Sequence, residues 1–167
     1  MVDDIAHDRK TNLWVAAGRW LLGAFSLVGG LTWALFAVHG PTAAVDLTIG
    51  IVFAVVGLVL LMPHRIRLPR LVTTVTMILF AVAGTAVGLV SARVRTCCEF
   101  AYIEDRGWPF AWAQRGAVAD DWATAERLAH GADWTVDFVA VATDALFWSY
   151  VGMVLVVIGV LVRYRRA

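Results

Sequence analysis

Charged residues are scarce in this sequence, since Asp, Glu, Lys and Arg make up only 16% of its 167 residues. Ordinary soluble domains contain about 25%. Hydrophobic residues reach 60% instead, which indicates an integral membrane protein with the lipid bilayer as a partner. The formal net charge is only +1. Because neutralising phosphates requires a dense basic face, which is missing here, the sequence argues against nucleic acid as a partner.

Lysine is almost absent as well, because Lys10 is the only one and arginine supplies the remaining basic residues. This bias, together with abundant Ala, Val and Gly, favours GC-rich coding and a prokaryotic source. Residues 1–10 are acidic and polar, so no cleavable signal peptide with a basic start is visible. We therefore expect the first hydrophobic segment to remain in the protein as a span.

The sequence motifs of common enzymes are also missing. The chain has no H-E-x-x-H, no G-x-S-x-G, no phosphate-binding glycine loop and no C-x-x-C. Its four histidines all lie at or beyond the ends of hydrophobic segments, which leaves no pair at mid-membrane depth to ligate a haem. They are His7, His39, His64 and His130. We expect no cofactor, and the sequence favours a protein that is not an enzyme.

Four hydrophobic segments are long enough to cross a bilayer, which requires about 20 residues. They cover residues 13–39, 43–62, 71–92 and 135–162. The polar stretch between the third and fourth segments, residues 96–134, is predicted to form an external cap made of a loop and a short helix. The predicted fold is therefore an all-α membrane protein, a single domain in which a left-handed four-helix bundle bears this cap.

Arginine placement predicts the orientation of the chain in the membrane. The turn at residues 63–70 and the C-terminal tail are both basic, whereas the turn at 40–42 has no basic residue. Because short basic segments stay in the cytosol, we expect both termini to be cytoplasmic and residues 96–134 to lie outside the plasma membrane. Arg93 and Arg95 are a counter-signal, since they lie at the membrane edge beside the cap.

Small residues line one side of the third span. Gly84 and Gly88 form a G-x-x-x-G pair, a spacing that places both glycines on one helix face and lets another backbone approach closely. The approaching helix could belong to this chain or to a second copy. We favour packing within the chain.

Ionisable residues at membrane depth are the strongest candidates for a polar site. They are Asp46, Asp137, Asp144 and Arg93. Asp144 lies about 10 to 13 Å inside the predicted fourth span, where a lone charge costs about 2.5 to 3.5 kcal/mol. It should face other helices, and Arg93 is close enough in sequence to the membrane edge to reach it. An internal polar tie is the favoured interpretation, and a carboxylate that handles protons, ions or a ligand is the alternative.

Cys97 and Cys98 are the only cysteines, and they are adjacent. A bond between neighbouring residues is strained, because their α-carbons lie about 3.8 Å apart, below the usual disulfide range. Inert or structural thiols are the favoured interpretation, ahead of a bond to another chain and of redox chemistry. Adjacent cysteines also lack zinc-site spacing, and convergence with Glu99 and His130 is not required by the sequence, so we predict no metal.

Aromatic residues are concentrated in the predicted cap and form its candidate membrane-interface or partner-binding surface. They are Phe100, Tyr102, Trp108, Phe110, Trp112 and Trp122. Rings at this position suit the aromatic belt of a membrane interface, which is favoured over a docking surface. Asp121 before Trp122 and Gly131 after His130 predict a short helix, with an aspartate cap and a glycine stop.

These observations favour an accessory, scaffolding or assembly subunit, which would bind other membrane protein subunits or a second copy of itself. Two alternatives remain open at this stage. One is a thiol-redox protein that uses Cys97 and Cys98. The other is a small-solute or proton-coupled transporter centred on Asp144, although four spans without an internal repeat are few for a carrier.

Overall fold

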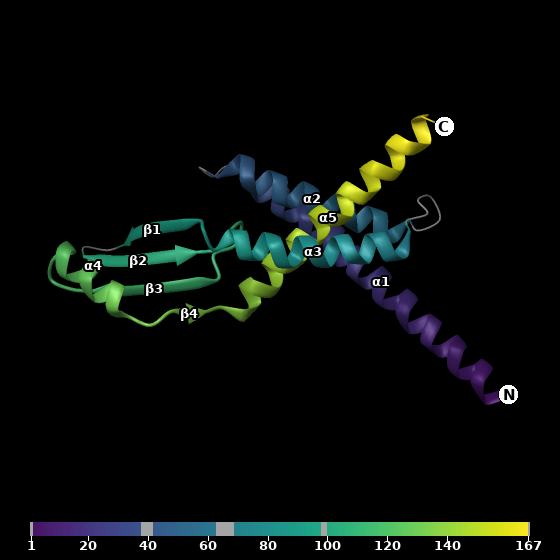
Figure 1. The fold of residues 1–167 in the computed structure, drawn as a ribbon, viewed down its shortest axis with the longest axis horizontal. Coiled ribbons are helices and arrows are strands. Elements are labelled where there is room, and N and C mark those ends of the chain that lie inside the picture. The colour runs from purple at the N-terminus through teal and green to yellow at the C-terminus, as the bar shows by residue number, and fades with distance from the viewer. Residues whose placement is uncertain (1, 38–41, 63–68, 98–99, 167) are drawn as a thin grey trace. The chain divides into compact units, whose positions relative to one another are not determined.

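The structure, a computed structural model, describes residues 2–37, 42–62, 69–97 and 100–166. This part of the chain forms five helices and four strands, whose arrangement along the chain can be followed by the labels in Figure 1. In chain order they are α1 (Val2–Phe36), α2 (Ala43–Leu61), α3 (Arg70–Gly88), β1 (Ala92–Cys97), β2 (Ala101–Arg106), β3 (Ala113–Val118), α4 (Trp122–Gly131), β4 (Thr135–Val136) and α5 (Phe138–Arg166).

Four of the helices contain segments that are long and apolar enough to cross a membrane: Leu13–Phe36, Ala43–Leu61, Arg70–Gly88 and Phe138–Arg165. These segments agree with the four predicted spans to within a few residues, and they support a multi-pass membrane protein. Two threonine hydroxyls inside them bond to carbonyl oxygens four residues earlier. Thr48 donates to Ala44 O at 2.7 Å, and Thr143 donates to Val139 O at 2.8 Å. Each hydroxyl is therefore satisfied within its own helix, without water.

The chain divides into two compact units. The first comprises residues 1–74 and 153–167, and the second comprises residues 75–152. The boundary between the units falls within α3 and within α5, so each of these helices has one part in the first unit and the other part in the second. Each unit has its own way of packing helices.

In the first unit, α1 and α2 pack through glycines. Gly23 and Gly30 are seven residues apart on α1, as Gly50 and Gly57 are on α2, so each pair lies on one face two turns apart. A side-chain carbon on Gly30 would lie 2.6 Å from the carbonyl oxygen of Gly50, and one on Gly57 would lie 2.7 Å from that of Gly23. The two backbones therefore touch, and only glycine fits at these positions. Sequence analysis did not single out these glycines.

The second unit contains a sheet, so the prediction of an all-α fold is wrong in this region. The strands are antiparallel in the order β1-β2-β3-β4 (Figure 1). The third helix ends at Gly88 and β1 begins at Ala92, where the predicted third span still continued. Likewise β4 occupies Thr135–Val136, the predicted start of the fourth span. Charged residues are buried on both faces of β2, at Glu104 and Asp105, which obscures the two-residue period of a strand. We call residues 89–137 the lobe.

One face of the sheet is covered by α4. The buried alanines Ala125 and Ala129 pack against Tyr102 of β2, with Ala117 of β3 beside them. The side chain of Asp121 accepts a hydrogen bond from Thr124 N at 3.0 Å at the start of α4. The short helix and its aspartate cap are therefore confirmed within the predicted cap region.

Candidate functional site

The loop between β2 and β3, residues 107–112, packs against the helices of the second unit. Trp148 Nε1 on α5 donates a hydrogen bond to Trp108 O at 3.2 Å. The Trp108 ring lies 5.5 Å from the Trp148 ring and 6.3 Å from the Phe147 ring, and the Phe110 ring lies 6.5 Å from the Phe147 ring. The structure thus places Trp108 and Phe110 against α5, where their rings join the lobe to this helix.

Both glycines of the G-x-x-x-G pair make room for tryptophan. A side-chain carbon on Gly84 would overlap the Trp148 ring, and one on Gly88 would lie 2.9 Å from Trp108 O. Their neighbours thus belong to the same chain, as the favoured interpretation held. The neighbours are a ring and a loop backbone, whereas the motif suggested a helix backbone.

Asp144 is fully buried on α5, with 0% of its surface exposed. Its Oδ1 accepts a hydrogen bond from Phe110 N at 3.3 Å, whereas its Oδ2 has no hydrogen-bond partner among the described residues. Thr85 of α3 lies beside this carboxylate without forming a hydrogen bond of good geometry. The Thr85 hydroxyl and Trp112 Nε1 are also buried, and neither has a hydrogen-bond partner in the part of the chain that the structure describes. We call Thr85, Trp112 and Asp144 the polar cluster.

A pocket of about 370 Å³ adjoins the polar cluster. Two members of the cluster line it, Thr85 from α3 and Trp112 from the loop, together with Ala145, which follows Asp144. The remaining walls are apolar side chains of α3 and the residue after it: Ala81, Val82, Ala86 and Leu89. The lining of the pocket is therefore almost entirely apolar, because the polar atoms of Thr85 and Trp112 are buried behind it.

The other two residues proposed to join Asp144 lie elsewhere. Asp137 precedes α5 and caps it, because its Oδ1 accepts hydrogen bonds from Val139 N at 2.9 Å and Ala140 N at 3.1 Å. Arg93 lies on β1 in register with Asp105, and its side chain is exposed. In the described ranges no ion pair joins Arg93 to Asp144. The contact described for the Asp144 carboxylate is thus with the loop, through Phe110 N.

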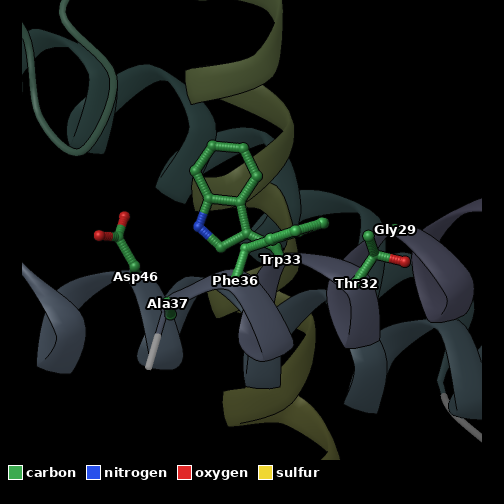
Figure 2. A pocket seen from close by; sticks show the side chains of 6 residues that line it. All are labelled: Gly29, Thr32, Trp33, Phe36, Ala37 and Asp46. Atoms are coloured by element: carbon green, nitrogen blue, oxygen red, sulfur yellow. The ribbon is translucent and has the colours of Figure 1, made fainter. Parts of the chain in front are cut away.

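Asp46 belongs to a second pocket, of about 450 Å³, in the first unit. This pocket is lined by Gly29, Thr32, Trp33, Phe36 and Ala37 of α1 and its end together with Asp46 of α2, and Figure 2 shows the Asp46 carboxylate and the Trp33 ring projecting in the same direction. The Asp46 Oδ2 atom accepts a hydrogen bond from the Thr42 hydroxyl at 2.6 Å. Asp46 is only partly buried, so nothing in its surroundings requires a further partner.

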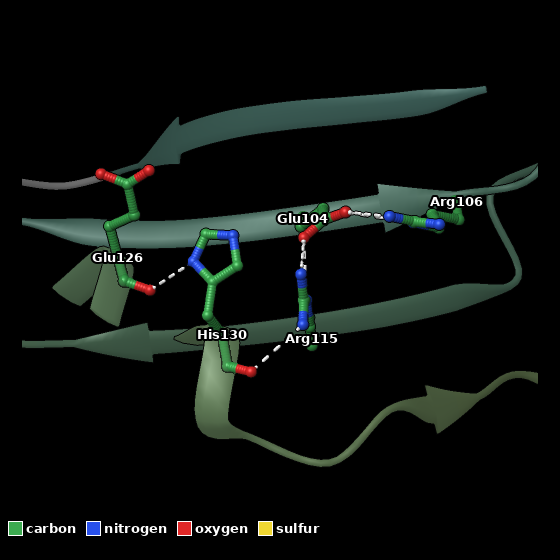
Figure 3. A network of polar contacts seen from close by, with 5 residues as sticks. All are labelled: Glu104, Arg106, Arg115, Glu126 and His130. Carbon is green, nitrogen blue, oxygen red and sulfur yellow. Dashed lines mark hydrogen bonds and ion pairs between the residues drawn. The ribbon is translucent and has the colours of Figure 1, made fainter. Parts of the chain in front are cut away.

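A charged network lies on the α4 side of the lobe (Figure 3). Glu104 is 5% exposed, and its carboxylate accepts hydrogen bonds from Arg106 Nη2 at 2.9 Å and Arg115 Nη2 at 2.5 Å. Arg115 also donates to His130 O at 3.3 Å. Burial raises the pKa of Glu104, but the bonds and charges of Arg115 and Arg106 outweigh it, so the pKa lies below its ordinary value.

Trp134 completes this network. The Arg115 guanidinium lies 4.6 Å from the Trp134 ring centroid, and that of Arg106 lies 5.1 Å from it, both within cation–π range. Sequence analysis missed Glu104, Arg115 and Trp134. The signal was available in the alternation of Tyr102, Glu104 and Arg106, which places them on one face of a strand.

The opposite face of the sheet is open. Five of its residues, two from β1 and three from β3, are exposed: Arg93, Arg95, Gln114, Gly116 and Val118. Between them, Asp105 is only 3% exposed and forms an ion pair with Arg95. We call these five exposed residues the open face. Among the described residues the strand β1 pairs with β2 alone, so β1 is an edge strand of this sheet.

The remaining predicted residues lie near the end of β1. Cys97 is its last residue, and Cys98 and Glu99 lie outside the described residues, so the thiol predictions stay predictions. Phe100 follows with a positive φ of 81° and is 46% exposed. Trp122 packs on Tyr102 with 5.4 Å between their ring centroids, so it belongs to the lobe core as well as to its surface.

Comparison with known proteins gives no further assignment. No protein-family model, curated protein sequence or solved structure matches this chain. Within the described residues, no group of three or more His, Cys, Asp or Glu side chains could hold a metal ion. The function therefore has to be argued from the lobe and the polar cluster.

Proposed function

We propose that this protein is an accessory or assembly subunit of a larger membrane complex, and that the lobe binds the partner. The observation that supports it is the one-sided cover of the sheet. The α4 face is closed by alanines and a buried charge network, whereas the open face presents Arg93, Arg95 and Val118 to solvent. A small lobe that builds a stable sheet and leaves one face free is suited to binding.

The chemistry of the open face suits a protein partner. Its arginines can form two-pronged hydrogen bonds with carboxylates, and Val118 is 74% exposed, so apolar contact is available beside them. The free edge of β1 offers unpaired backbone groups to which an extended segment could add as a further strand. The partner would be another membrane subunit or a second copy of the chain.

The proposal includes an orientation in the plasma membrane. The four spans form a bundle, both termini are cytoplasmic, and the lobe lies outside, as the basic turn at 63–70 favours. Reporter fusions after residues 62, 120 and 166 test this orientation. A cytosolic reporter signal at residue 120 would overturn it, since the lobe could then meet only cytosolic partners.

Co-purification tests the binding function. The full chain, extracted from its native membrane in mild detergent, should bring down a partner in fixed ratio. Arg93→Glu combined with Val118→Glu should abolish this recovery. Arg127→Glu is the matched control, because Arg127 lies on α4, which covers the other face, and is itself exposed. A lone monodisperse species, or equal loss in the control, would contradict the proposal.

Asp144 supports a second candidate function, a small-solute or proton-coupled transporter. Its burial next to a pocket, without a cation partner in the described residues, is the supporting observation. Asp144→Asn should then abolish uptake into proteoliposomes while the thermal unfolding temperature of the lobe stays unchanged. Unchanged uptake by the variant would remove this candidate.

A further inference from the structure

We propose that the pocket of the first unit binds an organic ammonium group, with its positive charge against the Asp46 carboxylate and the Trp33 ring. This inference goes beyond the accessory function, because that function concerns the lobe, whereas every residue that lines this pocket lies within residues 1–74. It rests on two observations, the charge of Asp46 in the lining and the exposed aromatic rings that line the same pocket.

The glycine contacts between α1 and α2 bring the pocket residues together. Gly30 meets Gly50, and the second glycine contact, seven residues earlier on α1 and seven later on α2, makes the helices antiparallel. Asp46 lies one turn before Gly50, and Trp33 lies one turn after Gly30. Since residues three or four apart share a helix face, the close backbone contact holds Asp46 alongside the part of α1 that carries Trp33.

Asp46 supplies the negative charge of the pocket. It is the one charged residue among the described residues of the lining, and within the described ranges no ion pair involves it. Its Oδ2 atom accepts a hydrogen bond from the Thr42 hydroxyl, but a carboxylate has about four acceptor positions, so one hydroxyl does not saturate it. Because Asp46 is only partly buried, a ligand in the pocket can reach the carboxylate.

The aromatic rings favour a cation as the ligand. Trp33 is 45% exposed and Phe36 is 81% exposed, and both line the pocket. Figure 2 shows the Trp33 ring on the same side of the two helices as the Asp46 carboxylate. A cation over the face of a tryptophan ring is attracted by it, and aromatic rings are the usual recognition elements for quaternary ammonium ligands.

Other classes of ligand fit this lining less well. An anion would be repelled by Asp46. A Ca²⁺ ion requires about six to eight oxygen ligands, whereas the described residues contain no group of three or more His, Cys, Asp or Glu side chains that could hold a metal ion. The volume of about 450 Å³ falls within the range of about 300 to 1,000 Å³ for small-molecule sites. The lining therefore selects an organic cation.

The position of the pocket along the helices indicates the source of such a cation. Phe36 is the last residue of the first apolar segment, and Asp46 lies in the first turn of the second. The pocket therefore lies where two spans end, at the depth of the lipid headgroups. Both phospholipid headgroups and free amphiphilic amines present ammonium groups at this depth.

Photolabelling tests this site. The probe is a diazirine-bearing dodecylamine, added to the full-length protein in dodecyl maltoside, a neutral detergent without an ammonium group. Labelling should saturate and map to the peptide that contains residues 29–37. Unlabelled dodecylamine and dodecyltrimethylammonium should compete. Dodecanol and dodecyl phosphate should compete at least roughly tenfold more weakly, because neither carries a positive charge.

A pair of lysophospholipids separates the two sources. Lysophosphatidylethanolamine carries an ammonium group, whereas lysophosphatidylglycerol of the same chain length does not. Stronger competition by the first would support the inference with a lipid headgroup as the ligand. Competition by neither, with dodecylamine still competing, would support it with a free amphiphilic amine. Equal and strong competition by both would contradict the inference, because the positive charge would then make no difference.

Variants connect the labelling to the pocket residues. Asp46→Asn keeps the shape but removes the charge, and it should weaken labelling roughly tenfold, as expected for the loss of a charged hydrogen bond. Trp33→Leu should weaken labelling roughly two- to fivefold, and Trp33→Phe, which keeps a ring, should weaken it less. The matched controls are Asp120→Asn and Trp14→Leu, which alter an exposed acid and an exposed ring outside the lining. Both should leave labelling unchanged.

Three further results would overturn the inference. Competition by dodecanol equal to that by dodecylamine would show a purely apolar pocket. Unchanged labelling of a folded Asp46→Asn variant would remove the carboxylate from the site. Labelling that does not saturate would show that no ammonium group binds there. The Trp33 variants keep the test decisive if Asp46→Asn fails to fold, and none of these results bears on the co-purification that tests the lobe.

Discussion

The two units use glycine in opposite ways. Between α1 and α2, Gly30 meets the Gly50 carbonyl, so backbone lies against backbone. On α3, Gly84 meets the ring of Trp148, so a glycine accommodates a large side chain. Both arrangements give close packing in a membrane, where small residues let helices approach. The difference shows that glycine spacing predicts closeness but does not identify the group that comes close.

The first unit should tolerate substitutions of its glycines less well than the second unit does. A backbone cannot move away from an added methyl group without shifting a whole helix, whereas a side chain can change its rotamer. The second unit also has polar contacts between loop and helix, from Phe110 N to Asp144 and from Trp148 Nε1 to Trp108 O. The predictions below test this contrast in order of expected effect.

The largest effect is expected for Gly30→Ala. Its methyl group would lie 2.6 Å from Gly50 O and 2.5 Å from Ala54 N, so the helices must separate, at a cost of about 3 kcal/mol or more. Thermal unfolding in detergent measures this loss. Gly29→Ala is the control, because nothing lies within 4 Å of the added carbon. Equal destabilisation by both variants would refute backbone contact.

Glu104→Gln should be the next largest. The variant removes the negative charge between Arg106 and Arg115 and should lower the free energy of unfolding by about 2 kcal/mol. This loss is smaller than the roughly 3 to 5 kcal/mol typical of breaking a fully buried ion pair, because the Arg106 side chain is 40% exposed. Since folding lowers the pKa of Glu104 from 4.5, its contribution is complete above pH 4.5 and is lost as the pH falls through the folded value.

Hydrogen exchange of the lobe at a series of pH values, corrected for the intrinsic rate, measures this dependence. Protection in β2 and β3 should fall on acidification in the native protein and should respond less in the Glu104→Gln variant. Protection in α1 and α2 should not change with Glu104 protonation, because the glycine contacts contain no ionisable group. A parallel loss in both regions would abolish the contrast between the units.

Gly84→Ala should cost less, about 1 to 2 kcal/mol. The added methyl group overlaps the Trp148 side chain, and a side chain can change its rotamer where a backbone cannot move. Trp148→Leu in the same chain should recover part of the loss, which a double-mutant cycle of thermal stability measures. No such rescue is available for Gly30, since its two nearest neighbours, Ala54 N and Gly50 O, are backbone atoms. Strictly additive effects of Gly84→Ala and Trp148→Leu would contradict the ring contact.

The smallest effect is expected at the start of α4. Asp121→Ala removes the hydrogen bond to Thr124 N and should speed amide exchange at Thr124 by roughly a few-fold, as for loss of a helix cap. Asp120→Ala, one residue earlier, should leave this rate unchanged. Faster exchange in both variants would point to a general charge effect instead of a cap.

The spans and the short helix could be predicted from the sequence, because long apolar runs and capping residues are local signals. The sheet could not, since β2 buries Glu104 and Asp105, and charged residues hide the alternation that predicts a strand. Their burial depends on Arg115 and Arg95, which lie on other strands. Pairing across strands is a property of the folded lobe and has no local sequence signal.

The candidate site could likewise be predicted only where the signal was local in the sequence. Asp144 was predicted to face the protein interior, because a lone carboxylate at this depth has few other solutions, and it is fully buried. Its neighbours Thr85 and Phe110 were not predicted, since they come from a helix and a hairpin loop that are distant in sequence. The loop rings were expected at a surface, yet Trp108 and Phe110 pack on α5.

The packing of residues 107–112 has a consequence for how the protein is made. The ribosome delivers α3 and this loop before α5, so Trp108 can settle on Gly88 before Asp144 has been synthesised. We expect the last helix to dock onto a surface that the lobe and α3 have already built. A delay in translocating or folding the lobe would leave the newborn α5 with a solitary acid in lipid, exposed to membrane quality-control proteases. Pulse-chase degradation assays on Trp108→Ala chains would reveal this dependence as a shortened half-life.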